Sequence, residues 1–266
     1  MNSIRSDNQR SIFMAAVPAK ADQQFGGPHS SGSARDEDRS LPLARRVYQN
    51  FGNPEVVDLL DRSANRVLDV GCGAGDNAAL LNSMLPHCEV FGITHSSAEA
   101  DIARKYMVEC WVGDIENEIP GQLRDLKFDA ILFSHVLEHL RDPALVLTRF
   151  SPLLRKGGQV IIAVPNVLAA RTRLRFLTGD FEYSPAGGVL DDTHLHFYTY
   201  FTADRYLLSG SPDLQLSRKV AAGHVPLPML RGRLIPRSLG KRIDQWACRH
   251  WPNLFADQVV FAAVKV

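Results

Sequence analysis

Residues 67–75 read VLDVGCGAG, an apolar run containing one aspartate that continues into three alternating glycines. Glycine has no Cβ and adopts positive φ angles readily, so a turn of this kind lets the backbone approach a ligand closely. The helical pattern that follows offers free N–H groups at its N-terminus. The stretch therefore predicts a ligand-binding turn at the carboxyl end of a β-strand, where open α/β sheets bind their ligands.

Strands and helices alternate from this turn to Pro165. We expect buried strands at 66–70, 88–93, 108–113, 128–134 and 157–165. Helical spacing predicts two short helices between 41 and 62, and further helices at 76–85, 97–107 and 143–154. Continuous apolar strands separated by helices indicate a parallel sheet covered on both faces. After Pro165 the pattern predicts a helix at 201–210 and strands at 214–222 and 257–266.

The chain divides into an N-terminal arm and one α/β domain. Residues 1–40 are rich in Ser, Gly, Gln, Asp and Arg and show little apolar periodicity, which predicts a flexible arm. Residues 41–266 form the domain. Within it, 166–200 and 223–256 interrupt the strand–helix rhythm, and we expect both to form insertions that cover a substrate.

Composition and charge exclude several classes of protein. The net charge of +1, from 30 basic and 29 acidic residues, gives no overall field that favours nucleic acid. The four cysteines form no C-x-x-C pair, so we expect free thiols in a reducing compartment and no zinc site. Neither a signal peptide nor a membrane-length apolar run is recognisable, which predicts a cytoplasmic protein.

The spacing of the glycines bears on the identity of the ligand. A dinucleotide turn of the form G-x-G-x-x-G beginning at Gly71 would require glycine at position 76, where Asp76 stands. The acid expected at the end of the second strand is also replaced, by Thr94. Asp69 lies within an apolar strand, and a buried carboxylate needs a partner such as a ligand ammonium group. An NAD-dependent oxidoreductase therefore stays only as a weaker alternative.

At this point the sequence resembles a known family. DVGCGAG (69–75) is similar to the D/E-x-G-x-G-x-G signature of class I S-adenosylmethionine-dependent methyltransferases. The resemblance continues at matching intervals through GDIE (113–116), FDAILFSHVLEHLRDP (128–143) and LLRKGGQVIIAVPN (153–166), and covers roughly residues 45–165. It is closest to the small-molecule and sugar-pathway type, the methyltransferase 11/23-like group.

The resemblance implies a fold and a cofactor. The fold is a doubly wound, Rossmann-like, mixed seven-stranded sheet with helices on both faces and a lid inserted after strand five. S-adenosyl-L-methionine would lie along the carboxyl ends of the strands, with Asp69 near its ammonium group and Asp114 near its adenine. The implied cofactor-binding residues are Asp69, Gly71, Cys72, Gly73, Gly75, Thr94, His95, Asp114, Ile115 and Ser134.

Candidate catalytic residues follow the fourth strand. A hydroxyl acceptor must lose its proton, and His135 and His139 in SHVLEHL are candidate bases. Some relatives that methylate hydroxyls hold a divalent metal through E-x-x-E-H, and here His135 replaces the first Glu. The sequence therefore predicts no metal, with a metal on His135, Glu138 and His139 as the alternative.

The segment GDFEYSPAGGVLDDTHLHFYT (179–199) resembles the substrate-covering part of the same group. In it we expect His194 as a further base or ligand, and Tyr183, Asp192 and His196, together with Arg173, as substrate-binding residues. Eight basic residues lie between Arg218 and Arg249 with one acid, Asp244. This bias suits an anionic or carrier-linked acceptor, a solvated helical face, or, together with Trp246, Trp251 and Phe255, peripheral contact with a membrane surface.

The sequence thus predicts a methyltransferase that modifies an oxygen of a small anionic or sugar-like molecule. The alternative is a methyltransferase-like binding subunit that supports another enzyme, which the weakened ribose contact at Thr94 favours. We expect a monomer or homodimer that binds a small-molecule substrate and no nucleic acid.

Overall fold

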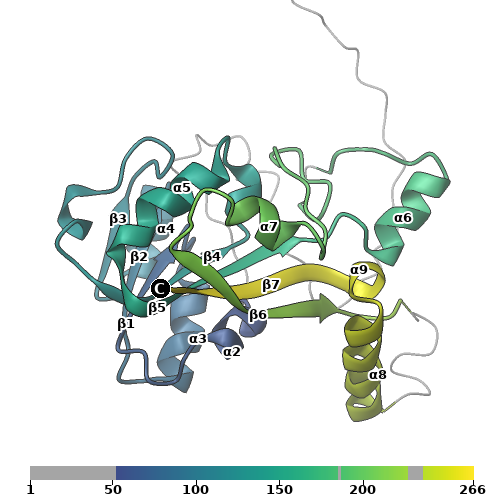
Figure 1. Ribbon diagram of the computed structural model, residues 1–266, viewed down its shortest axis with the longest axis horizontal. Coiled ribbons are helices and arrows are strands. Elements are labelled where there is room, and N and C mark those ends of the chain that lie inside the picture. Colours follow the sequence, from purple (N-terminus) through teal and green to yellow (C-terminus); the bar gives the residue numbers. More distant parts are fainter. Residues whose placement is uncertain (1–51, 185–186, 227–235) are drawn as a thin grey trace, which may run out of the picture. The chain divides into compact units, whose positions relative to one another are not determined.

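Seven strands form one mixed sheet in the order β3-β2-β1-β4-β5-β7-β6 (Figure 1). The computed structural model describes residues 52–184, 187–226 and 236–266. The strands are β1 (Arg66–Val70), β2 (Glu89–Thr94), β3 (Glu109–Val112), β4 (Phe128–Ser134), β5 (Leu154–Pro165), β6 (Leu214–Gly223) and β7 (Ala256–Lys265). The first five run parallel, and β7 pairs antiparallel with both β5 and β6. The predicted fold class is confirmed.

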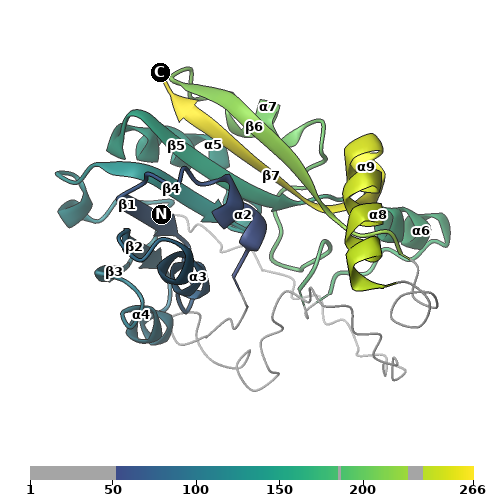
Figure 2. The same ribbon diagram turned by 90° about the horizontal axis from the view of Figure 1, so that it is seen from below.

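Helices cover both faces of the sheet (Figure 2). One face carries α2 (Pro54–Leu59), α3 (Asp76–Met84) and α4 (Ser97–Ala103), and their apolar side chains form one core cluster with β1 and β2. The other face carries α5 (Pro143–Phe150) and α7 (Ala203–Leu207), which pack in a second cluster around Phe133. Because both faces are covered, the central strands are apolar along almost their whole length, as parallel strands require.

The predicted helices exist, but several are shorter than their apolar patterns. Helix α4 ends at Ala103 rather than at residue 107, and α5 passes at Ser151 into a short 3₁₀ helix, η4 (Ser151–Leu153). Asp142 caps the N-terminus of α5, because its carboxylate accepts a hydrogen bond from the Leu145 amide at 2.9 Å. The arm at 1–40 and the first of the two predicted N-terminal helices lie outside the described residues.

Two insertions meet at the carboxyl end of β5. Helix α6 (Ala170–Leu177) follows β5, whereas α8 (Arg237–His250) and α9 (Pro252–Phe255) precede β7. Figure 1 shows α6, α8 and α9 at the same end of the sheet. Asn166 joins the two insertions. Its backbone N–H donates to the Asp257 carbonyl at 2.9 Å, and its side-chain amide donates to the Ala256 carbonyl at 2.8 Å. Across the described ranges, no helix is long and apolar enough to span a membrane.

The strand order reverses between β1 and β4, which lie side by side with Val70 opposite Phe133. The glycine turn begins here. The amides of Gly71 and Cys72 both donate to the Ile93 carbonyl of β2, at 2.8 and 2.9 Å. Gly71, Gly73 and Gly75 all have positive φ, as the turn requires. The reversal places this turn at the switch point, where doubly wound sheets bind ligands.

Gly71 fits a space that no larger residue fills. A Cβ at Gly71 would lie 2.4 Å from Cγ2 of Val136, in the turn after β4. We expect Gly71→Ala to lower the free energy of unfolding by about 1–2 kcal/mol through its φ of +73°, and by about 1–3 kcal/mol more through overpacking. Gly157→Ala is the matched control, because Gly157 has φ +78° with nothing within 4 Å of an added Cβ. Urea denaturation of both variants measures the difference, and equal losses would contradict the steric argument.

Candidate active site

Asp69 is a buried carboxylate in the middle of the sheet. It is fully buried, and neither carboxylate oxygen has a hydrogen-bond partner among the described residues. Burial raises the pKa of Asp69 to about 7, and the nearby Asp76 adds to this rise while the Asn77 amide opposes it. A buried acid without a partner is costly to the fold, so its position one residue before the glycine turn points to a ligand.

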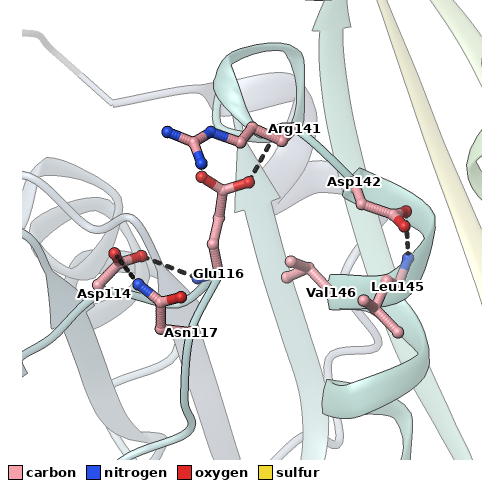
Figure 3. A pocket seen from close by; sticks show the side chains of 7 residues that line it. All are labelled: Asp114, Glu116, Asn117, Arg141, Asp142, Leu145 and Val146. Carbon is pink, nitrogen blue, oxygen red and sulfur yellow. Dashed lines mark hydrogen bonds between the residues drawn. The ribbon is translucent and has the colours of Figure 1, made fainter. Parts of the chain in front are cut away.

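Asp114, which was predicted to lie near the adenine, borders a pocket of about 260 Å³ (Figure 3). Asp114 lies at its rim, after β3, and its carboxylate accepts from the Glu116 amide at 3.0 Å and from the Asn117 side chain at 2.7 Å. Glu116 in turn accepts from the Arg141 amide at 2.5 Å, which joins the turn after β3 to the one after β4. Ile115 is buried beside Asp114. These bonds fix the rim and leave further acceptor lone pairs on Asp114.

The remaining predicted cofactor-binding side chains differ in their availability. Cys72 is buried with its Sγ 3.6 Å from Sγ of Cys110, so its side chain faces β3. Thr94 is buried and donates its hydroxyl to Glu99 at 2.5 Å, which leaves it as an acceptor only. His95 is exposed, and Ser134 is half-buried. Glu99 was missed by sequence reasoning, although its place in the first turn of α4 is the signal of a capping residue.

His135 is fixed by hydrogen bonds on both ring nitrogens. Its Nδ1 lies 3.3 Å from Oε1 of Glu138, and its Nε2 lies 2.9 Å from Oε1 of Gln258. Both partners are acceptors, so both nitrogens carry protons. Burial would lower the pKa of His135, but Glu138 raises it, and 41% of the side chain is exposed. The role of His135 as a catalytic base stays a prediction.

The network under His135 includes two residues that sequence reasoning missed. Asn53 donates to Oε1 of Gln258 at 2.8 Å and to Oγ of Ser134 at 3.5 Å. Gln258 comes from β7 and Asn53 from the residue before α2, so the network joins three distant parts of the chain. His135 also has φ +57°, the only positive φ of a non-glycine residue in the described part of the chain. The backbone strain and the network together indicate a functional turn.

Glu138, His139 and His194 form a cluster beside this turn. Glu138 and His139 lie in the 3₁₀ helix η3 (Leu137–His139), and His194 comes from the segment after β5. One ligand atom from each of the three lies within 4.8 Å of the others. The imidazole rings of His139 and His194 meet edge to face with centroids 4.7 Å apart. The structure therefore brings together two of the three predicted catalytic histidines.

The protonation of the two rings follows from their partners. His139 Nδ1 lies 2.9 Å from Oγ1 of Thr193, whose hydroxyl donates to Asp191 at 2.6 Å, so the ring nitrogen is the donor. His194 Nδ1 lies 3.1 Å from the Val189 carbonyl and must also donate. In neutral rings this leaves a lone pair on each Nε2. Burial lowers the pKa of His194, and nearby His139 lowers it further, which favours the neutral ring.

Glu138 completes the cluster with a buried charge. Burial alone would raise the pKa of Glu138, but the hydrogen bond and charge of His135, with a further contribution from His139, bring it below its usual value. Its side chain is 1% exposed, and Oε2 has no hydrogen-bond partner among the described residues. Its carbonyl accepts from the Leu195 and His196 amides at 2.8 and 3.1 Å, which anchors the segment after β5 to η3.

The predicted substrate residues are dispersed. Arg173 donates to the carbonyls of Leu168 and Asn253, at 2.7 and 3.4 Å, and so joins α6 to α9. His196 lies with Nε2 3.2 Å from the Arg141 carbonyl. Tyr183 is 54% exposed and Asp192 is exposed. The basic segment is only partly described, because Arg231 and Arg233 lie outside the described residues, while Lys219 pairs with Asp204.

The aromatic side chains of the second insertion are exposed. Trp246 and Trp251 are 53% and 51% exposed, and their rings meet edge to face at 5.2 Å. Trp251 also contacts Phe255, with ring centroids 6.1 Å apart. The predicted membrane-surface contact stays a prediction, since this patch fits several partners.

Comparison with known proteins identifies the chain. The family model Methyltransf_23, described as a methyltransferase domain, matches residues 37–207. The chain belongs to this family. It is a class I S-adenosylmethionine-dependent methyltransferase, as its sequence resemblance predicted, and S-adenosylmethionine is its methyl donor. The oxidoreductase alternative is thereby excluded.

Individual relatives support the same assignment. The methyltransferase is 34% identical over 128 residues to a ubiquinone biosynthesis O-methyltransferase of Chromobacterium violaceum, covering 43% of this chain and 52% of the relative. It is 36% identical over 110 residues to a demethylmenaquinone methyltransferase of Thermotoga maritima, covering 40% and 47%. The chain thus spans about half the length of these curated relatives. Another Thermotoga maritima methyltransferase, of solved structure, shares the fold with TM-score 0.53 and 20% identity over 79% of this chain and 86% of that one.

The residues of the switch point fit the methyl donor. S-adenosylmethionine carries an ammonium group, and the carboxylate of Asp69 is an acceptor with no other partner among the described residues. The turn from Gly71 to Gly75 exposes backbone beside it, and an added Cβ at Gly71 would strike Val136. Asp69 and these glycines would hold the methionine part of the donor, which supplies an electrophilic methyl group when bound.

Asp69→Asn should reveal the cost of the buried carboxylate. An acid whose folded pKa is raised from 3.8 to about 7 loses stability as the pH rises through that interval. Without cofactor, we expect the wild-type free energy of unfolding to fall by up to about 3 kcal/mol relative to Asp69→Asn between pH 5 and pH 8. Urea denaturation at pH 5, 6, 7 and 8 measures this difference, and parallel curves would show that Asp69 is ionised at no cost.

Proposed function

We propose that this methyltransferase transfers a methyl group to a hydroxyl oxygen of a small acceptor that has an aromatic or apolar body. The observation that carries the proposal is the cluster of Glu138, His139 and His194, which offers only electron-pair donors to whatever lies against it. A hydroxyl group is the acceptor that needs such a site, because its proton must leave as the new bond forms. A carboxylate acceptor would be repelled by Glu138.

The surroundings of the cluster support an apolar body rather than a strongly anionic one. Phe197 lies 6.4 Å from His194, ring to ring, and is 40% exposed. Leu195 is 55% exposed, and Phe181 and Tyr183 are each 54% exposed in the same segment. The arginines expected to bind an anion are engaged elsewhere, since Arg173 binds carbonyls and Arg175 binds Asp180. We propose that residues 166–200 form the lid over this acceptor.

The curated relatives point in the same direction. They carry the names ubiquinone biosynthesis O-methyltransferase and demethylmenaquinone methyltransferase, and the chain matches about half of each. Both names describe quinone chemistry. A hydroxylated ring with an apolar substituent therefore ranks above the sugar-like or anionic acceptor that the sequence alone suggested.

The chemistry assigned to the chain is positioning and proton removal. The backbone of the glycine turn and Asp69 orient the methyl donor, while the cluster orients the acceptor oxygen for in-line attack. The O–CH₃ bond forms as the S–CH₃ bond breaks, and the sulfonium becomes a neutral thioether. The hydroxyl proton leaves through the cluster towards water, and Glu138 stabilises the positive charge that develops there.

An acceptor panel tests the proposal. We expect turnover of catechols and hydroxylated quinols to exceed that of hydroxylated sugars and of aliphatic hydroxy acids by about tenfold or more. A factor of this size is expected from burying a few methylene-sized groups of the acceptor. Mass spectrometry of each product measures the methyl transferred and its position. Preference for an amine, or for the sugars and acids, would overturn the acceptor class.

The binding of the methyl donor should depend on pH. The donor's ammonium pairs only with ionised Asp69, whose pKa is about 7 in the free protein. We therefore expect affinity, in about the micromolar range, to fall about tenfold per pH unit below pH 7. Asp69→Asn should bind weakly and without this slope. Isothermal titration calorimetry between pH 5.5 and pH 8 measures both, and an equal slope in the variant would assign the proton to another group.

A second candidate is a methyltransferase-like subunit that supports another enzyme. Thr94 favours it, because its hydroxyl is donated to Glu99 and the acid expected at the end of β2 is absent. Methyl-donor binding without turnover of any acceptor in the panel would favour this candidate.

A further inference from the structure

We propose that Glu138, His139 and His194 bind a divalent transition-metal cation at the acceptor site. This inference rests on the proposed hydroxyl methylation, but it assigns the cluster the binding of a cation in place of proton removal by the histidines themselves. The three residues come from two segments at least 55 positions apart, yet one ligand atom of each lies within 4.8 Å of the others. A cation bound between these electron-pair donors would be coordinated by all three residues.

The strongest argument is the direction of the hydrogen bonds. His139 donates Nδ1–H to Thr193, and His194 donates Nδ1–H to the Val189 carbonyl. The Nε2 atoms are left with lone pairs, and neither has a hydrogen-bond partner among the described residues. Metal-ligating histidines show this arrangement, in which the second ring nitrogen donates to a carbonyl or hydroxyl and so fixes the ring.

Glu138 provides the independent observation. Its side chain is 99% buried in the fold, while Oε2 has no partner among the described residues. A buried carboxylate oxygen of this kind is costly unless it is paired or coordinates a metal. Oε1 is bonded to His135, which orients the carboxylate in the way that outer residues orient a metal ligand.

The ligand set selects the class of metal. Two imidazoles and one carboxylate suit zinc, manganese or iron and leave open positions for other ligands. Mg²⁺ prefers oxygen ligands and is expected to bind more weakly. His135, which the sequence alternative placed in the ligand set, uses both its nitrogens in bonds to Glu138 and Gln258. The third ligand instead comes from the lid.

A cation at this point would lower the pKa of the acceptor hydroxyl. The acceptor oxygen takes an open position, its proton passes to water, and the metal-held oxygen attacks the methyl carbon. One O–C bond forms, one S–C bond breaks, and no electron is gained or lost by the metal. Because His194 belongs to the lid, the same cation would join the lid to the turn after β4.

The test is a titration of the chelator-treated full chain with Zn²⁺, followed by isothermal titration calorimetry in the absence of donor and acceptor. We expect one site with a micromolar or tighter dissociation constant, weakened about 100-fold or more in His139→Ala and His194→Ala. Co²⁺ provides a second readout, because its visible absorption reports nitrogen ligands and should be lost in the same variants. Mg²⁺ is titrated in parallel and is expected to bind at least tenfold more weakly.

His196→Ala is the matched control, since His196 lies two residues from His194 on the same segment but outside the cluster. It should bind Zn²⁺ like the wild type. Glu138→Gln tests the carboxylate, and a thermal melt shows whether this buried variant is folded. The proposed site would be overturned if the wild type did not bind Zn²⁺, or if His194→Ala and His139→Ala bound Zn²⁺ as strongly as the wild type.

Turnover separates this inference from the proposed function. We expect the chelated wild type to lose at least about tenfold in rate and to regain it with Zn²⁺ or Mn²⁺. Full turnover of a catechol by the chelated protein would overturn the role of the cation and leave hydroxyl methylation standing. Zn²⁺ binding with the expected variant pattern, but no turnover of any hydroxyl acceptor, would support the site and overturn the proposed function.

Discussion

The contact between Gly71 and Val136 is the constraint on which the functional edge of this methyltransferase depends. A Cβ at Gly71 would lie 2.4 Å from Cγ2 of Val136, so the turn after β1 and the turn after β4 are pressed together. The first turn is the part of the chain that we propose holds the methyl donor. Val136 immediately precedes η3, which carries Glu138 and His139. The distance between donor and acceptor is therefore determined by a packing contact, because close packing transmits small displacements from one turn to the other.

Two buried carboxylates border this contact, and the protein treats them differently. Within the described ranges no basic group offsets the burial of Asp69, so burial raises its pKa to about 7 and a proton or a ligand ammonium would balance it. Glu138 has His135 and His139 beside it, which bring its pKa below the usual value despite burial. The protonation of Asp69 can therefore change when a ligand binds, whereas Glu138 stays charged. Only Asp69 reduces the stability of the fold at neutral pH, because its pKa is raised while that of Glu138 is lowered. Such a local conflict is expected where a site is built for function.

The sequence predicted what depends on local pattern. The strands from Arg66 to Pro165 lie within three residues of their expected bounds, because long apolar runs and glycine turns are local signals. It could not predict the partners of His135, since Gln258 reaches it only through the antiparallel pairing of β7 with β5. Nor could it predict that Arg173 binds backbone carbonyls of another insertion. Roles for His95 and Asp192 stay predictions.

The bonds between η3 and the segment proposed as the lid bear on how the acceptor would be recognised. The Glu138 carbonyl accepts from two lid amides, and His139 is bonded to Thr193 of the lid. The lid therefore does not move independently of the residues that prepare the acceptor, because any large displacement would break these bonds and separate His194 from Glu138. Selection among acceptors then falls to side chains that are not part of this network, chiefly the exposed aromatic groups such as Phe197 and Phe181. In this arrangement the residues at the sheet edge can serve methyl transfer in every case, while the side chains on the lid surface differ with the acceptor. This is expected of a fold that serves many substrates.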